Sequence, residues 1–129
     1  MAPTQSYQPL KEDHRNWLNQ LNFFHDEIKF MQNRLAEVAA SENNHKNFKS
    51  TIADYKYKFY NMLERIDEFR YLIYRHDKEL AGMMELSNRT KQKVNLEEDH
   101  HTIKDQYERF VAQYYTLKDN FHHFLTTVQ

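Results

Sequence analysis

The chain has 129 residues, a formal net charge of −1 and no cysteine. Its length fits one domain, and its balanced charge argues against binding to the phosphate backbone of nucleic acids. One glycine and two prolines are too few for a β-rich fold or for the glycine loops of a nucleotide-binding fold. The lack of cysteine excludes disulfides, thiolate metal sites and cysteine nucleophiles.

Hydrophobic residues make up 40% of the chain, enough to build a core. No stretch approaches about 18 uncharged apolar residues, so no transmembrane helix and no membrane partner are expected. The first residues lack a basic segment followed by an apolar one. Because this is not the pattern of a secretory signal, a cytoplasmic location is predicted.

The first predicted element is a helix over about 9–40, after a flexible tail at 1–8. Pro9 suits the first turn of a helix, where its missing N–H costs nothing. Apolar residues then recur every three or four positions, which places them on one helix face. This first seam consists of Leu10, His14, Trp17, Leu21, Phe24, Ile28, Met31, Leu35 and Val38.

The second predicted helix spans about 45–86 and follows turn-forming residues at 41–44. Gly82 lies near its end, where a helix often weakens or stops. The second seam consists of Phe48, Ile52, Tyr55, Phe59, Met62, Ile66, Phe69, Ile73, His76, Leu80 and Met83.

The third predicted helix spans about 95–127. Asn95 followed by Glu98 resembles a capping box at its start. Residues 85–94 are compatible with a loop, a short helical turn or an extension of the second helix. The third seam consists of Leu96, His100, Ile103, Tyr107, Phe110, Tyr114, Leu117, Phe121, Phe124 and Val128.

Short links favour antiparallel neighbours. The sequence therefore predicts an elongated, antiparallel up-down-up three-helix bundle over 9–129, with heptad seams like those of a coiled coil. Pairing of two such bundles into a dimer remains open.

Large residues also lie off the seams, and they have two interpretations. In the first, they widen the core stripe and their amphipathic rings lie along the surface of the bundle. In the second, they form an interface with a protein partner or a second copy of the chain. The candidate interface residues are Phe23, Phe30, Tyr57, Tyr60, Tyr71 and Tyr74.

Apart from three histidines, every seam residue is aliphatic or is Met, Phe, Tyr or Trp. The histidines are His14, His76 and His100. In an up-down-up bundle they fall near one end. Three imidazoles from three helices would suit Zn²⁺, Cu²⁺ or another borderline divalent transition metal. Nearby carboxylates that would support such a site belong to Asp13, Asp77 and Glu97.

Two other interpretations of the histidines remain. An even spread of eight histidines would put about two on the seams, so three can be ordinary packing residues. Alternatively, imidazoles packed together would repel one another when protonated and would loosen that end near pH 6.

No nucleophile with a base and no phosphate-binding loop is visible. The sequence therefore favours a non-enzymatic interaction or structural module, with self-association or a protein partner and without nucleic acid. A metal-binding protein using the three histidines is the alternative.

Several stretches resemble a group of uncharacterised short helical-bundle proteins from Bacteroidetes bacteria. They are Trp17-Leu18-Asn19, residues 27–39, Ile66-Asp67-Glu68-Phe69-Arg70 and Phe121-His122-His123-Phe124-Leu125. The resemblance implies a helical bundle in a bacterial cytoplasm and implies no activity.

Overall fold

The computed structural model describes the backbone of residues 3–85 and 90–128, and the side chains of residues 8–82 and 98–128. Its helices are α1 (Pro3–Ala40), α2 (Glu42–Asn47), α3 (Lys49–Glu85) and α4 (Thr90–Thr127). No strand occurs among these residues, which confirms the prediction of an all-α chain. Within the same residues, no helix is long and apolar enough to cross a membrane.

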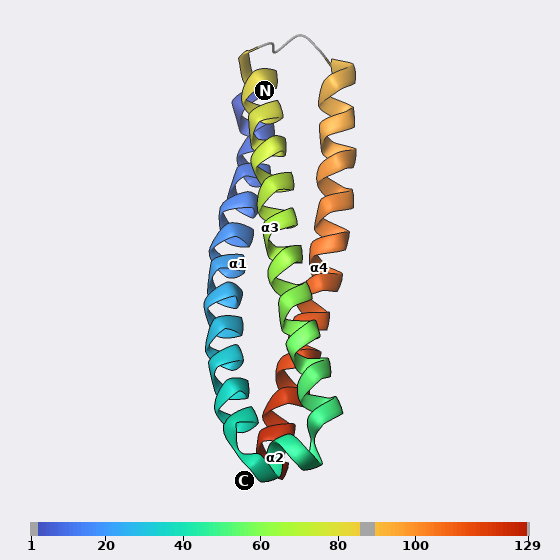
Figure 1. The fold of residues 1–129 in the computed structure, drawn as a ribbon. Coiled ribbons are helices and arrows are strands. Elements are labelled where there is room, and N and C mark those ends of the chain that lie inside the picture. Colours follow the sequence, from blue (N-terminus) through green and yellow to red (C-terminus); the bar gives the residue numbers. More distant parts are fainter. Residues whose placement is uncertain (1–2, 86–89, 129) are drawn as a thin grey trace.

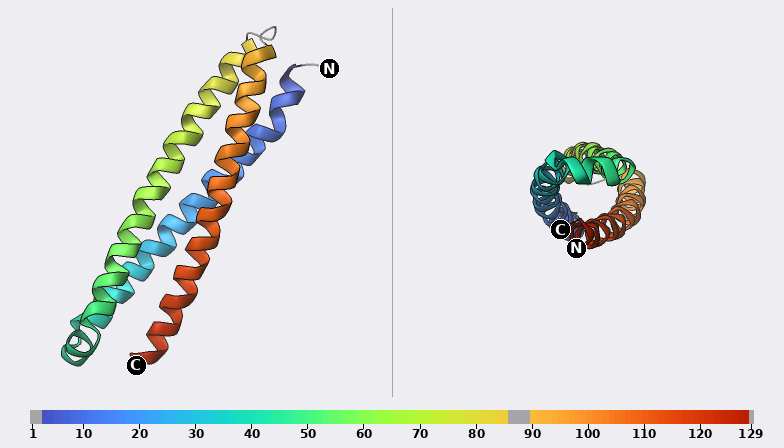
Figure 2. Two further views of the ribbon diagram at one scale, coloured as in Figure 1. Left: turned by 90° about the vertical axis from the view of Figure 1, so that its right-hand side faces the viewer. Right: turned by 60° about the horizontal axis from the view of Figure 1, so that its bottom comes forward.

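Three long helices pack side by side, and the short α2 lies at one end of them (Figure 1). The chain runs down α1, turns through α2, returns along α3 and runs back along α4. Viewed obliquely from one end, the long helices surround a common centre (Figure 2). With 38 residues in α1, the bundle is about 57 Å long at 1.5 Å per residue.

The core follows the three predicted seams. Every side chain that is buried in the described part of the chain belongs to one of them. The described seam residues that stay partly exposed, Leu10, Phe48 and Val128, lie at the ends of their runs. A heptad pattern therefore located the core correctly, because its period keeps one face of each helix turned inward.

Two predicted boundaries differ from the structure. These are the start of the first helix and the link between the first and second long helices. α1 begins at Pro3 and contains Pro9, since Pro3 suits the first helical position as well as Pro9 does. The link holds the six-residue α2, whose N-cap is Ser41 and whose C-cap is Phe48. The Ser41 hydroxyl accepts from the backbone N–H of Asn44, as N-cap residues do.

Two further sequence signals lie inside helices, and α3 ends close to the predicted residue 86. α3 continues through Gly82 to Glu85, and Gly82 does not adopt the positive φ of a helix-ending glycine. α4 begins at Thr90 and includes Asn95, because no glycine or proline interrupts residues 90–95. Of the open segment 85–94, residues 86–89 lie outside the described part.

A ladder of side-chain hydrogen bonds joins α1 to α4. Each of its three contacts links residues 87 positions apart. Because one constant separation recurs at heptad intervals, α1 and α4 run in the same direction with one fixed alignment. The ladder consists of His100 with Asp13, Tyr107 with Gln20, and Tyr114 with Glu27.

Candidate metal centre

The three seam histidines meet in one layer of the bundle. His14 comes from α1, His76 from α3 and His100 from α4, and all three are buried. His14 Nε2 lies 3.1 Å from His76 Nδ1 and 3.2 Å from His100 Nδ1. One nitrogen of each ring lies within 4.8 Å of the other two. Three potential ligand atoms from three helices therefore converge on one point.

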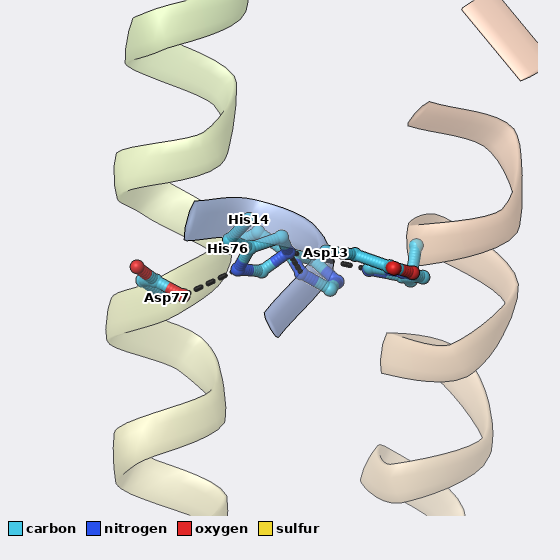
Figure 3. Close-up of polar contacts among 5 residues, drawn as sticks. Asp13, His14, His76 and Asp77 are labelled. Carbon is cyan, nitrogen blue, oxygen red and sulfur yellow. Dashed lines mark hydrogen bonds and ion pairs between the residues drawn. The ribbon is translucent and has the colours of Figure 1, made fainter. Parts of the chain in front are cut away.

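Two carboxylates hold the outer sides of two of these rings. His14 Nδ1 is hydrogen-bonded to Asp77 Oδ1, and His100 Nε2 lies 2.9 Å from Asp13 Oδ2. Figure 3 shows Asp77 on the α3 side of the cluster and His14 on the turn of α1. Both carboxylates are partly exposed. They orient the imidazoles as carboxylates behind metal-bound histidines do.

These carboxylates also fix which ring nitrogens carry hydrogen. A carboxylate accepts, so His14 donates from Nδ1 and His100 donates from Nε2. In the neutral rings, the opposite nitrogens then carry lone pairs. Those nitrogens, His14 Nε2 and His100 Nδ1, face each other at 3.2 Å. Two acceptors at this distance repel each other unless a proton or a cation lies between them.

Burial disfavours the protonated form of His14 and of His100. It lowers the pKa of His14, with the Asp77 hydrogen bond opposing the shift. It also lowers the pKa of His100, with the Asp13 hydrogen bond opposing it. In both cases burial dominates because the charged ring loses solvation. The rings therefore favour the neutral, lone-pair form that coordinates metal ions.

The spacing suits a small transition-metal ion. Zinc–nitrogen bonds of about 2.0–2.1 Å in a tetrahedron place ligand nitrogens about 3.3 Å apart. The two separations from His14 Nε2, 3.1 Å to His76 Nδ1 and 3.2 Å to His100 Nδ1, are close to this value. The three ligand atoms all lie within 4.8 Å of one another.

Apolar residues surround the layer along the bundle axis. α1 and α4 run away from this end of the bundle and α3 runs toward it (Figure 1). The buried residues Trp17, Ile73 and Ile103 are therefore one turn nearer the bundle centre than the histidines, and Leu80 is one turn nearer the end. The Trp17 ring stacks on His100, with ring centroids 5.0 Å apart and planes inclined by 19°. The stack restricts the plane of the His100 ring.

The structure also places the predicted carboxylates and the candidate interface residues. Of the expected carboxylate supports, Asp13 and Asp77 contact the histidines, whereas the side chain of Glu97 lies outside the described part. The six candidate interface residues are all exposed, and they divide between α1 and α3. They are Phe23 and Phe30 on α1, and Tyr57, Tyr60, Tyr71 and Tyr74 on α3.

Sequence reasoning missed two features beside the site, the Trp17 stack and the α1–α4 ladder. The ladder had a detectable signal, because Asp13, Gln20 and Glu27 recur every seventh residue beside the first seam. The stack had none, since Trp17 occupies an ordinary seam position. Comparison of the chain with protein-family models, with curated proteins and with solved structures finds no match in any of the three.

Proposed function

We propose that this protein binds a divalent transition-metal ion, Zn²⁺ before others, through His14 Nε2, His76 Nδ1 and His100 Nδ1. One observation carries the proposal. Two carboxylates hold the outer nitrogens of His14 and His100, and the remaining nitrogens converge within a buried layer. This combination of converging lone pairs with outer carboxylate partners is typical of histidine metal sites.

The chemistry of the donors narrows the choice of ion. Imidazole nitrogens suit Zn²⁺, Cu²⁺ and Ni²⁺, whereas Mg²⁺ and Ca²⁺ prefer oxygen ligands. Three neutral rings and the carboxylates of Asp13 and Asp77 balance the two positive charges of such an ion. The ion would therefore enter a buried layer without leaving an unpaired charge there.

The ion would join all three long helices. Its ligands lie on α1, α3 and α4, so it would act as a cross-link at the end of the bundle that holds the start of α1. Binding to the folded state alone raises stability by about 2.7 kcal/mol at a hundred times Kd. For a chain of this size, that gain corresponds to roughly 10 °C in Tm.

The test measures stoichiometry and stability together. Untagged protein is stripped with chelator, incubated with Zn²⁺, exchanged into metal-free buffer and examined by elemental mass spectrometry. We expect about one zinc per chain and a Tm higher than that of the stripped protein. The absence of any retained Zn²⁺, Cu²⁺, Ni²⁺ or Co²⁺ would contradict the proposal.

Matched variants locate the ion. His76→Leu and His100→Leu replace a buried imidazole with an apolar side chain of similar size, which suits the neighbouring apolar layers. Both variants are expected to fold and to lose stoichiometric metal. His101→Ala is the control, because His101 adjoins His100 in sequence but is 76% exposed. Retention of metal by folded His76→Leu would show that the assignment of the ligands is wrong.

The exposed aromatic residues favour a second candidate function, a protein-interaction surface. Phe30 is 72% exposed on α1, and Tyr71 is 60% exposed on α3. Aromatic residues are enriched at the centres of interfaces. We infer either self-association of antiparallel three-helix bundles into a dimer or binding of another protein. Arg75 and Lys78, which lie over the rings of Tyr71 and Tyr74, support instead a role as amphipathic surface cover.

The oligomeric state separates these alternatives. Sedimentation equilibrium of the wild-type chain is compared with that of Phe30→Glu and Tyr71→Glu. A dimer that dissociates in either variant supports the interface. A chain that is monomeric at every concentration tested removes the basis for self-association.

A further inference from the structure

A groove between α3 and α4 lies in the half of the bundle nearer α2, and we call it the Arg65 groove. It has a volume of about 410 Å³, which falls within the range of roughly 300–1,000 Å³ for ligand pockets. On α3 it extends from Lys58 to Arg65, a length of about 10 Å at 1.5 Å per residue. His76 lies about 16 Å farther along the same helix, so the groove is separate from the candidate metal centre.

The lining of the Arg65 groove combines apolar surface with positive charge. The buried residues Met62 and Leu117 contribute apolar atoms. Its charged residues are Lys58 and Arg65, and no carboxylate lines it among the residues that the structure describes. The neutral polar residues of the lining are Asn61, Gln113, Thr116 and Asn120. Such a lining favours an anion that also carries an apolar part.

The guanidinium of Arg65 is held in place without being neutralised. Its Nη1 donates to Gln113 Oε1 on α4, and its Cζ lies 4.9 Å from the centroid of the Phe110 ring. Both partners are neutral. Within residues 8–82 and 98–128, no carboxylate forms an ion pair with Arg65. A guanidinium that is already oriented loses little conformational freedom when it binds an anion.

The surroundings of Arg65 indicate where the rest of such an anion would lie. The groove on the other side of Arg65 is lined by Glu68 and Arg109, whose opposite charges offset each other. Within the Arg65 groove itself, Lys58 already pairs with Asp54, with Nζ 2.8 Å from Oδ2. One uncompensated positive charge therefore remains, at Arg65, which favours an anion with a single negative charge.

We propose that the Arg65 groove binds a small monocarboxylate with an unbranched apolar chain. A guanidinium has five N–H donors, and Gln113 takes only one from Arg65, so others remain for the carboxylate oxygens. The chain lies along Met62 and Leu117, where it removes apolar surface from water. This site makes no use of the histidines, and the proposal is independent of metal binding.

The experiment follows the binding of hexanoate to the metal-free, full-length protein by NMR of backbone amides. Hexanoate is expected to shift the amide signals of groove residues with saturation. Three further probes separate its two parts: hexanamide lacks the charge, acetate lacks the chain, and inorganic phosphate has charge without apolar atoms. Each is expected to bind at least about tenfold more weakly than hexanoate, as loss of a hydrogen bond to a charged group predicts for hexanamide.

Matched variants test the role of Arg65. Arg65→Gln keeps a polar side chain but removes the charge, and it is expected to weaken hexanoate binding about tenfold while leaving hexanamide binding unchanged. Arg70→Gln is the control, because Arg70 lies on the same helix but bonds to Asp67 and to Asn22 on α1. Arg70→Gln should bind hexanoate as the wild type does.

The outcomes distinguish the ligand class from the site. Equal affinity of Arg65→Gln and the wild type for hexanoate, or amide shifts that avoid the groove, would overturn the site. Acetate or phosphate binding as tightly as hexanoate would overturn the assigned ligand class, because the apolar lining would then contribute nothing. His100→Leu is expected to bind hexanoate normally, so failure of the metal site leaves this result unaffected.

Discussion

The indole of Trp17 stacks on the imidazole of His100, with ring centroids 5.0 Å apart and planes inclined by 19°. Trp17 is the only tryptophan in the chain, and its ring also lies 5.6 Å from that of His14. The tryptophan fluorescence of the protein therefore originates beside two of the three candidate metal ligands.

We expect this tryptophan to report on metal binding. Cu²⁺ and Co²⁺ have partly filled d shells that accept excitation energy, so stoichiometric addition of either ion should quench Trp17 fluorescence strongly. Zn²⁺ has a filled d shell and should change the intensity much less. Titration of the stripped protein tests this, with His100→Leu as the comparison. Equal quenching in His100→Leu and the wild type would indicate collision with free ions.

Removal of the Asp77 carboxylate is expected to weaken metal binding without preventing it. Asp77 orients His14 through Nδ1, and loss of such a carboxylate typically lowers metal affinity about 10–100-fold. Competition with a chromophoric chelator would measure the change in Kd for Asp77→Ala. Asp77→Asn should recover part of the affinity, because the amide oxygen can still accept from the ring. Asp67→Ala, at a position 73% exposed, serves as the control and should match the wild type.

The stability of the metal-free protein is expected to fall as the pH drops below about 6.5. Burial lowers the pKa of His14 and His100 below the ordinary value of 6.5. The unfolded chain then binds more protons than the folded chain once the pH falls below that value. The stability that the two neutral histidines contribute is therefore fully present above about pH 6.5, and it is lost as the pH falls toward their lowered pKa values.

Urea unfolding at several pH values between about 8 and 5 measures this dependence. The double variant with His14→Leu and His100→Leu should show a shallower decline, because it lacks both depressed groups. An increase in wild-type stability on acidification through this range would contradict the expectation.

Glu27 is expected to contribute measurably to stability. Its carboxylate accepts from the Tyr114 hydroxyl and from Lys118 Nζ, the latter at 2.9 Å. Burial acts to raise the pKa of Glu27, but these hydrogen bonds outweigh it and lower the pKa. Glu27→Ala leaves both donors without this acceptor, so we expect a loss of about 1–3 kcal/mol.

Chemical denaturation of Glu27→Ala beside Glu37→Ala would measure the effect. Glu37 pairs with Arg34 at the surface and is 67% exposed, so its removal should cost less than about 0.5 kcal/mol. Similar losses in the two variants would show that the inter-helix position of Glu27 confers no advantage.

Gly82→Ala is expected to stabilise the bundle by about 0.5–1 kcal/mol. Gly82 lies within α3 without a positive φ, and an added Cβ would meet no atom within 4 Å. The gain arises because alanine loses less backbone freedom than glycine on folding. Thermal unfolding checks it, and the mirror substitution Ala81→Gly on the same helix should have the opposite sign.

The sequence determined the core because that inference needs only local information. Spacings of three and four residues place Phe24, Ile66 and Phe110 on inward faces whatever the alignment of neighbouring helices. Helix ends were less predictable. The signals at Pro9, Gly82 and Asn95 each contribute about 1 kcal/mol or a few, and the backbone is helical through all three positions.

The sequence suggested that the three histidines lie close together, but it could not establish this. A shift of one heptad between helices would separate His14 from His100 by about 10 Å while preserving the apolar pattern of the seams. The alignment depends on polar residues beside the seams, such as Gln20 against Tyr107 and Glu27 against Tyr114. Their partners lie 87 positions away in the chain, which no local pattern indicates.

This separation has a consequence for the order of events as the chain folds. The contact between His14 and His76 closes a loop of 62 positions, and that between His14 and His100 closes one of 86. Contacts so distant in sequence form only after α3 has turned back along α1 and α4 has docked beside both. An ion bound by all three rings would therefore bind only late in folding. Its binding would distinguish a fully folded chain from one in which α4 has not yet docked.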